Sequence, residues 1–307
     1  MYLKTLGDIW NHFGETDPMW AVLMDPARDG NRWNKGEFFE TGREDVKQAM
    51  QTIGKMTFPL RHGRALDFGC AVGRLTQGLA SYFDEVHGVD IAPAMILRAR
   101  AANPYGERCR FHVNQRSDLR MFADHQFDFV FSLLVLQHMR PALAKSYLAE
   151  FLRVLAPGGL LLFQQPTGYS STRLSDETYP PQAHEPEGWR ERLLNKVHDR
   201  FCAPLPPMPR ATEYERSLTA RPRYPYLPPL EAEDMHTRVD AAQRSVPTRS
   251  HATPSDVPYK KPLTELHTVP RWKMLAHLRR LGGRVLAIQS RNECSPHHPS
   301  LRYFVTR

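Results

Sequence analysis

The sequence predicts an α/β protein whose central sheet is mostly parallel and covered by helices on both faces, which is a doubly wound fold. Two observations lead to this prediction. From Arg64 onward, apolar runs of strand length alternate with amphipathic runs of helix length. The first of these strands ends in a turn with two glycines four residues apart, within "ALDFGCAVGRL" (65–75). With 307 residues, the chain is long enough for one elaborated domain or for two.

The strands and helices of this pattern can be placed in order along the chain. The predicted strands cover 64–68, 86–90, 110–113, 127–134, 160–164, 284–289 and 301–307. The predicted helices between them begin after Gly73 and cover 93–103, 142–155 and 271–283. Pro93 lies in the first turn of its helix, where a missing N–H costs no hydrogen bond. In 142–155 apolar residues recur at helical spacing, and the "PGG" that follows ends the helix.

The first 54 residues form a separate region ahead of the sheet. Residues 7–33 are predicted to be rich in turns, because Gly, Asp and Pro recur there beside the tryptophans. A helix is predicted next, because Asn34 and Glu37 have the spacing of a capping box and Gly54 can close the helix. Its apolar face consists of Phe38, Val46, Met50 and Ile53.

Residues 166–270 form a third region that contains most of the prolines of the chain. It shows little apolar periodicity apart from one basic amphipathic helix predicted over 189–201, which could contact a membrane surface. Two interpretations stay open, an ordered lid over an acceptor pocket and a partly disordered linker. The pocket of the first interpretation would be lined by Trp189, Tyr214, Tyr224 and Tyr226. The predicted domains are therefore 1–54 (cap), 55–165 with 271–307 (catalytic) and 166–270 (insertion, acceptor lid).

The net charge and the cysteine content narrow the class of protein. The net charge of +8 is concentrated near the end, because residues 271–307 hold eight Lys and Arg against one Glu. A solvated basic helix face explains this better than a nucleic-acid surface. The four cysteines contain no C-x-x-C pair, which argues against a disulfide framework or a zinc ribbon and favours a cytoplasmic protein. No signal peptide, membrane span or metal cluster is predicted, and His297 and His298 read as a solvated loop.

The glycine turn indicates which ligand the fold binds. Its spacing is Asp67-x-Gly69-x-x-x-Gly73, with Ala71 where a dinucleotide fingerprint would have a glycine. The Asp67 carboxylate would repel a pyrophosphate and attract an ammonium group. Asp90 ends the next strand about 20 residues later, where a carboxylate can accept both hydroxyl protons of a ribose. These residues favour a nucleoside with a cationic amino-acid tail over NAD.

Five stretches, two of which contain these residues, resemble the class I S-adenosylmethionine-dependent methyltransferases, in particular a bacterial small-molecule subgroup. The stretches are "LDFGCAVGRLTQGLA", "VHGVDIAPAMI", "NQRSDL", "FDFVFSLLVLQHM" and "FLRVLAPGGLLLF". The resemblance implies a seven-stranded Rossmann-like sheet with an antiparallel last strand, an N-terminal helical cap, the Pro-rich insertion after strand five and S-adenosylmethionine as cofactor. Ala71 departs from the family's glycine, and we expect a minor effect because a methyl group there disfavours only a positive φ.

The resemblance also assigns site residues. The predicted cofactor-binding residues are Trp33, Phe38, Asp67, Gly69, Cys70, Ala71, Gly73, Asp90, Ile91, Met95, Ser117, Asp118, Leu119 and Leu133. Asp118 would face the adenine amino group. Trp33, Phe38, Phe39 and Gly42 would contact the methionine end of the cofactor or, alternatively, only pack the N-terminal helix onto the sheet.

Methyl transfer from a sulfonium is an in-line displacement, so the protein mainly aligns the acceptor and excludes water. His138 is the predicted general base because it lies just past strand four; the alternative is a structural histidine. Gln137 beside it could bind a ligand. The predicted function is methyl transfer to an oxygen of a sugar, glycoconjugate or secondary metabolite. The alternatives are a nucleic-acid methyltransferase, opposed by Ser132-Leu-Leu-Val in place of that class's motif, and a non-catalytic cofactor-binding partner.

Overall fold

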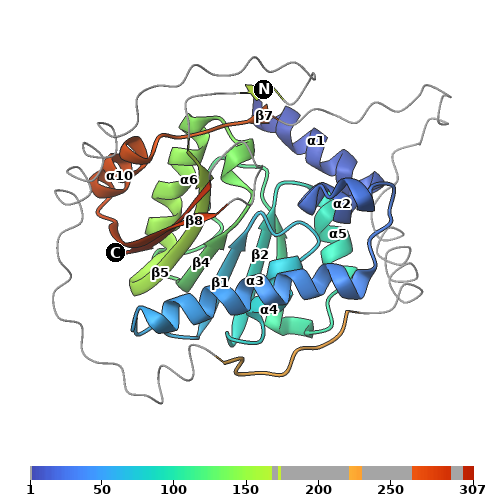
Figure 1. The fold of residues 1–307 in the computed structure, drawn as a ribbon, viewed down its shortest axis with the longest axis horizontal. Coiled ribbons are helices and arrows are strands. Elements are labelled where there is room, and N and C mark those ends of the chain that lie inside the picture. The colour runs from blue at the N-terminus through green and yellow to red at the C-terminus, as the bar shows by residue number, and fades with distance from the viewer. Residues whose placement is uncertain (1, 168–171, 174–220, 230–264, 292–299) are drawn as a thin grey trace. The chain divides into compact units, whose positions relative to one another are not determined.

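The computed structural model describes residues 2–167, 172–173, 221–229, 265–291 and 300–307 (Figure 1). Two compact units divide the described chain. Unit 1 comprises 2–56, 62–116 and 221–229, and unit 2 comprises 57–61, 117–167, 172–173, 265–291 and 300–307. Their strands form a seven-stranded sheet in the order β3-β2-β1-β4-β5-β9-β8, together with a two-stranded pair, β6-β7. This order confirms the predicted fold class.

The three strands of unit 1 are parallel. They are β1 (Arg64–Phe68), β2 (Glu85–Asp90) and β3 (Cys109–Val113), with β2 between the other two. All of β1 after Arg64 is buried, as expected for a strand covered on both faces. The helices between these strands are α4 (Arg74–Leu79) and α5 (Pro93–Ala101), and a short 3-10 turn, η2 (Gly106–Arg108), precedes β3. The sequence predicted all three strands to within a residue or so.

Unit 2 contains the mixed half of the sheet. Its strands β4 (Phe127–Ser132) and β5 (Leu155–Pro166) are parallel and are separated in the sequence by η3 (Leu136–His138) and α6 (Pro141–Val154). After α10 (Arg271–Arg280), strand β8 (Arg284–Arg291) leads to β9 (Ser300–Thr306), which lies antiparallel between β5 and β8. The predicted antiparallel last strand is therefore confirmed.

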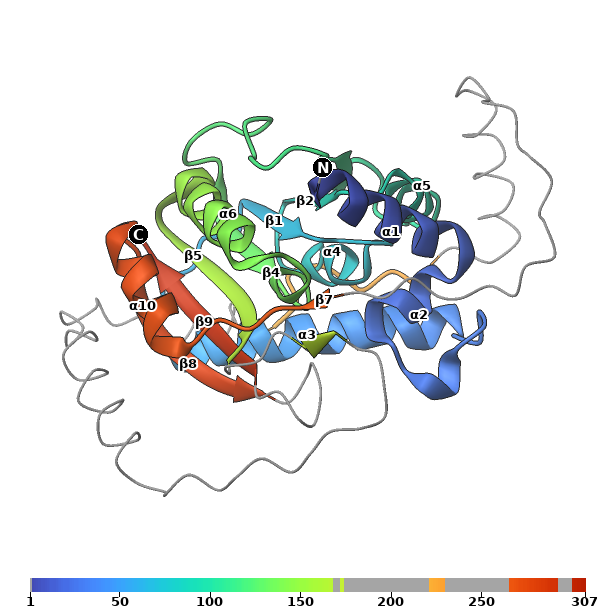
Figure 2. The same cartoon turned by 90° about the horizontal axis from the view of Figure 1, so that it is seen from above.

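The N-terminal region is more helical than predicted. Residues 7–33 were expected to be rich in turns, but α1 (Tyr2–Thr16) and α2 (Pro18–Leu23) occupy most of this stretch before the short η1 (Pro26–Arg28). The expectation was wrong because the glycines of α1 serve close packing instead of turns. A Cβ on Gly14 would lie 2.9 Å from Ala94 Cβ and from Met95 N, at the start of α5. Figure 2 shows α1 lying along α5.

Two side chains join α1 to α5 in opposite directions. Asn11 Oδ1 accepts a hydrogen bond from the N–H of Ala94, 2.9 Å away, in the first turn of α5. Arg98 of α5 donates to the carbonyls of Gly14 and Glu15 at the end of α1. Each helix thus satisfies backbone groups that the other helix leaves open at its terminus, and Arg98 also complements the α1 macrodipole.

Helix α3 (Lys35–Lys55) begins where the capping box predicted. The Asn34 side chain accepts a hydrogen bond from the N–H of Glu37 at 3.1 Å, and the predicted apolar face is buried. The helix continues through Gly54 and ends at Lys55, so the glycine does not close it.

The ends of the predicted insertion are paired with each other. Strand β6 (Thr172–Arg173) pairs antiparallel with β7 (Glu265–Leu266). The predicted helix 189–201, the side chains of Trp189 and Tyr214, and the loop with His297 and His298 lie outside the described residues.

Candidate active site

The glycine turn between β1 and α4 is a tight loop whose amide groups are used internally. The N–H groups of Gly69 and Cys70 donate to the carbonyl of Val89 on β2, at 2.8 and 3.0 Å. Gly73 donates to Cys70 O at 2.8 Å. A loop that cradles phosphate needs several amides free to point at the anion. The internal bonding therefore argues against a pyrophosphate ligand.

The backbone of this loop takes the left-handed conformation three times. Gly69, Ala71 and Gly73 have φ values of 79°, 46° and 87°. Glycine adopts such values freely, whereas an L-residue with a Cβ is disfavoured there. Ala71 was expected to be a minor departure because only a positive φ would matter, and the structure shows that it does have a positive φ. The substitution therefore strains this loop more than was predicted.

Asp90, at the end of β2, joins the loop to the start of α5. Its Oδ2 accepts from the N–H of Ala71 and its Oδ1 from the N–H of Ala92, both at 2.9 Å. A carboxylate has about four acceptor positions, more than the backbone N–H groups around Asp90 occupy, so it can still accept a ligand hydroxyl. Desolvation raises the pKa of Asp90, and these backbone hydrogen bonds oppose that rise. The geometry fits the predicted contact with a ribose diol.

Asp67 is completely buried behind the loop. Thr76 Oγ1 donates to its Oδ2 at 2.6 Å, while Oδ1 has no hydrogen-bond partner. Burial raises the pKa of Asp67 to about 7, against the smaller opposite effects of Thr76 and Arg74. A buried carboxylate with one unsatisfied oxygen is a costly feature that a bound cation would relieve. The sequence indicated the carboxylate but not its partner Thr76.

The aromatic residues of the N-terminal region pack against this loop. Phe38 and Phe39 are buried in a cluster that includes Ala71, Val72 and Met95. Trp33 lies at the margin of the cluster, with its ring edge-on to Phe38 and the Arg28 guanidinium 5.2 Å from its centroid. Its indole N–H is buried without an acceptor. Phe38 and Phe39 are thus buried in this cluster, whereas Trp33 has a buried polar group that a ligand could use.

Gly42 has a structural role in the same region. A Cβ at this position would lie 2.2 Å from the carbonyl oxygen of Arg74, the first residue of α4. Close beside this crossing, Arg74 NH1 forms an ion pair with Asp45 Oδ2 at 2.7 Å, and the Arg74 side chain is only 4% exposed. Helix α3 is therefore held against the residue that follows the glycine turn.

Unit 1 gathers most of the predicted cofactor residues around one turn. They are Trp33, Phe38, Asp67, Gly69, Cys70, Ala71, Gly73, Asp90, Ile91 and Met95. The remaining four belong to unit 2. Ser117 is exposed, and Leu119 and Leu133 are buried. Asp118, predicted to face the adenine amino group, forms an ion pair with Arg120 at 2.7 Å.

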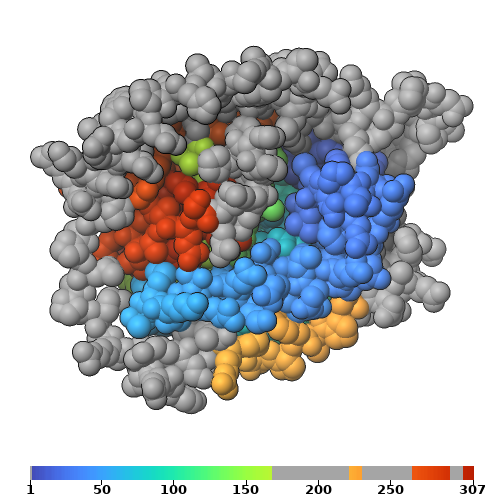
Figure 3. Space-filling model, viewed as in Figure 1, coloured from blue at the N-terminus to red at the C-terminus, as the bar shows by residue number. Residues whose placement is uncertain are grey.

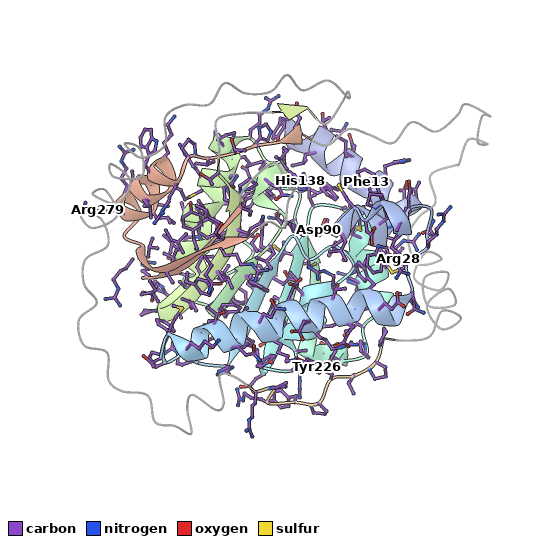
Figure 4. All side chains as sticks on the ribbon, viewed as in Figure 1. Phe13, Arg28, Asp90, His138, Tyr226 and Arg279 are labelled. Atoms are coloured by element: carbon purple, nitrogen blue, oxygen red, sulfur yellow. The ribbon has the colours of Figure 1, made fainter. Side chains whose placement is uncertain are left out.

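The predicted base, His138, lies in η3 after β4 and is 7% exposed. Its Nε2 is 3.2 Å from Gln137 Nε2, and Gln137 Oε1 in turn lies 3.5 Å from Gln164 Nε2 on β5. Burial lowers the pKa of His138 to about 4, so the imidazole is neutral near pH 7. Figure 4 labels His138 in this region. The neutral imidazole of His138 can therefore accept a proton, but its low pKa makes it a weak base.

The last residues of the predicted insertion contact the residues around His138. The N–H of His267, just after β7, donates to Gln137 O at 2.6 Å, and His267 O accepts from Gln165 Nε2 at 2.9 Å. His267 Nε2 also lies 3.1 Å from Glu265 Oε2. The sequence did not single out His267 or Gln165, because nothing in the Pro-rich stretch indicated which of its residues return to strand five.

Two of the tyrosines predicted to line an acceptor pocket lie elsewhere. Tyr224 bonds to Asp84, just before β2, and the Tyr226 hydroxyl lies 3.4 Å from that of Tyr82. Both contacts are at the amino-terminal ends of the strands of unit 1, whereas the glycine turn and Asp90 lie at the carboxyl-terminal ends. The prediction for these two residues was wrong, because proline spacing along the chain does not say which edge of a sheet a segment crosses.

Comparison with known proteins decides the family. Residues 66–163 match the family described as a methyltransferase domain. The chain carries a class I S-adenosylmethionine-dependent methyltransferase domain. This identification confirms the family predicted from the sequence motifs, whose cofactor is S-adenosylmethionine. The match runs from β1 to β5 and so includes the glycine turn, Asp90 and His138.

Two curated relatives resemble this methyltransferase domain. One is a malonyl-[acyl-carrier protein] O-methyltransferase of Halorhodospira halophila, 38% identical over 102 residues, which are 33% of this chain and 34% of the relative. The other is a trans-aconitate 2-methyltransferase of Azoarcus, 32% identical over 180 residues, which are 57% of this chain and 63% of the relative. The chain therefore matches less than two thirds of the length of each.

A solved structure shares the fold of this chain. It is the magnesium protoporphyrin IX methyltransferase of Synechocystis with bound SAH, which covers 99% of both chains with a TM-score of 0.52 at 14% identity. Within the part of this chain that the structure describes, no group of three or more His, Cys, Asp or Glu side chains is placed to hold a metal. None of the described helices is long and apolar enough to cross a membrane.

Proposed function

We propose that the chain transfers the methyl group of S-adenosylmethionine to an oxygen atom of a small molecule. The observation that carries this proposal is the hydrogen bonding of Asp90. Its two oxygens accept the N–H groups of Ala71 and Ala92, which fixes the carboxylate at the glycine turn and still leaves acceptor capacity for a ligand. That arrangement suits a ribose with two free hydroxyls, as in an adenosine cofactor.

Two buried polar atoms of unit 1 fit the other end of such a cofactor. The unsatisfied Asp67 Oδ1 would interact favourably with an ammonium group, and the Trp33 indole N–H would donate to a carboxylate. Both residues belong to, or pack against, the glycine turn. S-adenosylmethionine supplies a methyl group on a positively charged sulfur, and the residues of the chain only have to hold and orient it.

The acceptor is proposed to be an oxygen that is already ionised near neutral pH, such as a carboxylate. A sugar hydroxyl needs a general base with a pKa near 7, whereas burial lowers the pKa of His138 to about 4. A carboxylate needs no proton removal. An oxygen acceptor also agrees with the O-methyltransferase among the relatives. His138 would then orient the acceptor through hydrogen bonds instead of removing its proton.

The cofactor assignment is tested by isothermal titration calorimetry. The wild-type chain is expected to bind both S-adenosylmethionine and its demethylated product. Asp90→Ala should weaken binding by about 2–4 kcal/mol, because it removes hydrogen bonds to a charged group. The matched control is Glu107→Gln, whose carboxylate is 96% exposed in the same unit. Unchanged affinity of Asp90→Ala would refute the ribose contact.

The acceptor class is tested with radiolabelled cofactor. The panel contains trans-aconitate, a malonyl thioester, a catechol, a methyl glycoside and a short RNA. Transfer to the carboxylates, with none to the glycoside, supports the proposal. Transfer to the RNA, or to the glycoside alone, contradicts it. Cofactor binding without transfer to any of these acceptors would favour the non-catalytic partner instead.

A further inference from the structure

A proline-rich segment crosses the amino-terminal edge of unit 1. This segment, 221–229, has the sequence "RPRYPYLPP", with prolines three residues apart at 222, 225 and 228. All its contacts described below are to residues that precede β1, β2 or β3, or to α3. Figure 3 shows it as an extended stretch of atoms beneath α3. Prolines fix φ near the value of a polyproline II helix and push the residue before them to the same region.

From Tyr224 to Pro229 the exposure of the segment follows a period of three, whereas Arg221, Pro222 and Arg223 are all exposed. Pro222, Pro225 and Pro228 are exposed, whereas Tyr224 and Leu227 are half-buried, as are Tyr226 and Pro229. Polyproline II has three residues per turn, so residues three apart share an edge. The exposed edge carries the three regularly spaced prolines, and the tyrosines face the protein. The prolines therefore provide stiffness, and the contacts come from the other two edges.

Tyr224 is the most firmly held residue of the segment. Its N–H donates to Ser81 O at 2.8 Å, and its hydroxyl donates to the Asp84 carboxylate. The guanidinium of Arg108 lies 3.7 Å from the centre of its ring, the distance of a close cation–π contact. A phenylalanine at this position would keep the stacking but lose the bond to Asp84.

The residues on either side of Tyr224 extend the contact. Arg223 NH1 donates to His62 O at 3.1 Å. The Tyr226 hydroxyl lies 3.4 Å from that of Tyr82, a completely buried residue, and the Arg43 guanidinium of α3 is 5.7 Å from the Tyr226 ring. The N–H of Leu227 donates to the Tyr105 hydroxyl at 2.9 Å.

We propose that this face of unit 1 is a recognition site for an extended proline-rich segment carrying Tyr-x-Tyr, and that the chain fills the site with its own residues 221–229. A stiff segment loses little conformational entropy when it docks, which favours binding by few contacts. The site offers one carboxylate, two stacking guanidinium groups and two tyrosine hydroxyls to the segment. It is separate from the glycine turn: Figure 4 shows Asp90 and Tyr226 on different sides of α3.

The proposal is tested with a fluorescent peptide of residues 219–231. The full-length chain carrying Tyr224→Ser and Tyr226→Ser should leave the site open and bind this peptide saturably. The wild-type chain should bind it at least tenfold more weakly, because its own segment competes. A peptide with Tyr224→Phe should bind about tenfold more weakly to the open variant, because the bond to Asp84 is lost. A scrambled peptide is the control.

The absence of saturable binding to the folded open variant, or equal binding of the scrambled peptide, would overturn the proposal. Hydrogen exchange of the wild-type chain gives a test that needs no variant. The amides of Tyr224 and Leu227 donate hydrogen bonds and should be protected, whereas that of Arg221 serves as the comparison within the same segment. Exchange of all three at the rate of an unstructured peptide would contradict the proposed docking.

Discussion

Ala71 occupies a backbone conformation that costs an L-residue about 1–2 kcal/mol. Replacement by glycine removes this strain but increases the entropy of the unfolded chain. We therefore expect Ala71→Gly to raise the free energy of unfolding by about 0.5–1 kcal/mol, measured by urea denaturation. The control is Ala80→Gly, because Ala80 has φ −60° and no such strain to relieve. It should lower the free energy of unfolding, and equal effects at the two positions would contradict the strain at Ala71.

Asp67 is a residue whose burial destabilises the cofactor-free protein. Its pKa rises from 3.8 to about 7 on folding. The folded state thus binds the proton more tightly, and its stability falls as the pH rises from about 4 to 7. An asparagine side chain resembles the protonated carboxyl group, so Asp67→Asn should raise the free energy of unfolding at pH 8 by about 4 kcal/mol. The gain should fall to less than half of this value at pH 5, and an equal gain at both pH values would be inconsistent with this shift.

A substitution of Asp67 should change the stability of the protein and its affinity for S-adenosylmethionine in opposite directions. Asp67→Asn removes the negative charge that faces the expected ammonium group, so calorimetry should show weaker binding of S-adenosylmethionine. A buried charge that lowers stability and raises affinity is typical of functional residues. Thr76→Val is the matched variant, because it removes the donor to Asp67 and leaves the carboxylate in place.

Among the helices, the crossing of α3 and α4 depends on one glycine. A Cβ on Gly42 would overlap the Arg74 carbonyl, 2.2 Å away, and a backbone atom cannot move aside cheaply. Gly42→Ala should therefore lower the free energy of unfolding by about 2–3 kcal/mol, although alanine favours a helix. The control Gly36→Ala lies in the same helix, where a Cβ would meet only the Asn34 side chain at 3.2 Å. Similar effects at both positions would refute the tight crossing.

The elements that could be predicted from the sequence are those whose local pattern and tertiary packing agree. Strand β1 and the start of α3 are examples, since apolar burial and a side-chain cap act within a few residues. Helix α1 was missed because a sequence does not show which of two roles Gly7 and Gly14 have. They can form turns, or they can admit a neighbouring helix, and only the position of α5 decides between these.

The residues of the candidate site also divide into those that could be predicted from the sequence and those that could not. Asp90 and the glycine turn were predicted because their spacing follows from strand, turn and helix in succession. The partner of Asp67, the neighbours of His138 and the location of Tyr224 depend on residues distant in the sequence. His267, for example, meets Gln137 after a separation of more than a hundred residues, and no periodicity encodes that meeting.

For the whole molecule, two buried histidines contribute to the loss of stability in acid. Burial lowers the pKa of both His112 and His138 from 6.5 to about 4. Each binds its proton less tightly in the folded state, so stability is lost as the pH falls from 6.5 towards 4. His138→Gln should lose about 2 kcal/mol less than the wild type between pH 7.5 and pH 5 in urea denaturation. His112→Gln should change in the same direction, and parallel curves for all three proteins would contradict these shifts.

The pairing of β6 with β7 brings Thr172 and Leu266 opposite each other, although more than ninety residues separate them in the chain. Neighbouring strands lie about 5 Å apart. The two ends of this long stretch therefore lie side by side in unit 2, whereas residues 221–229 within it contact α3 and the turns before β1, β2 and β3. Because the two ends meet, a stretch of another length could join β6 to β7 without a change in any strand of the main sheet.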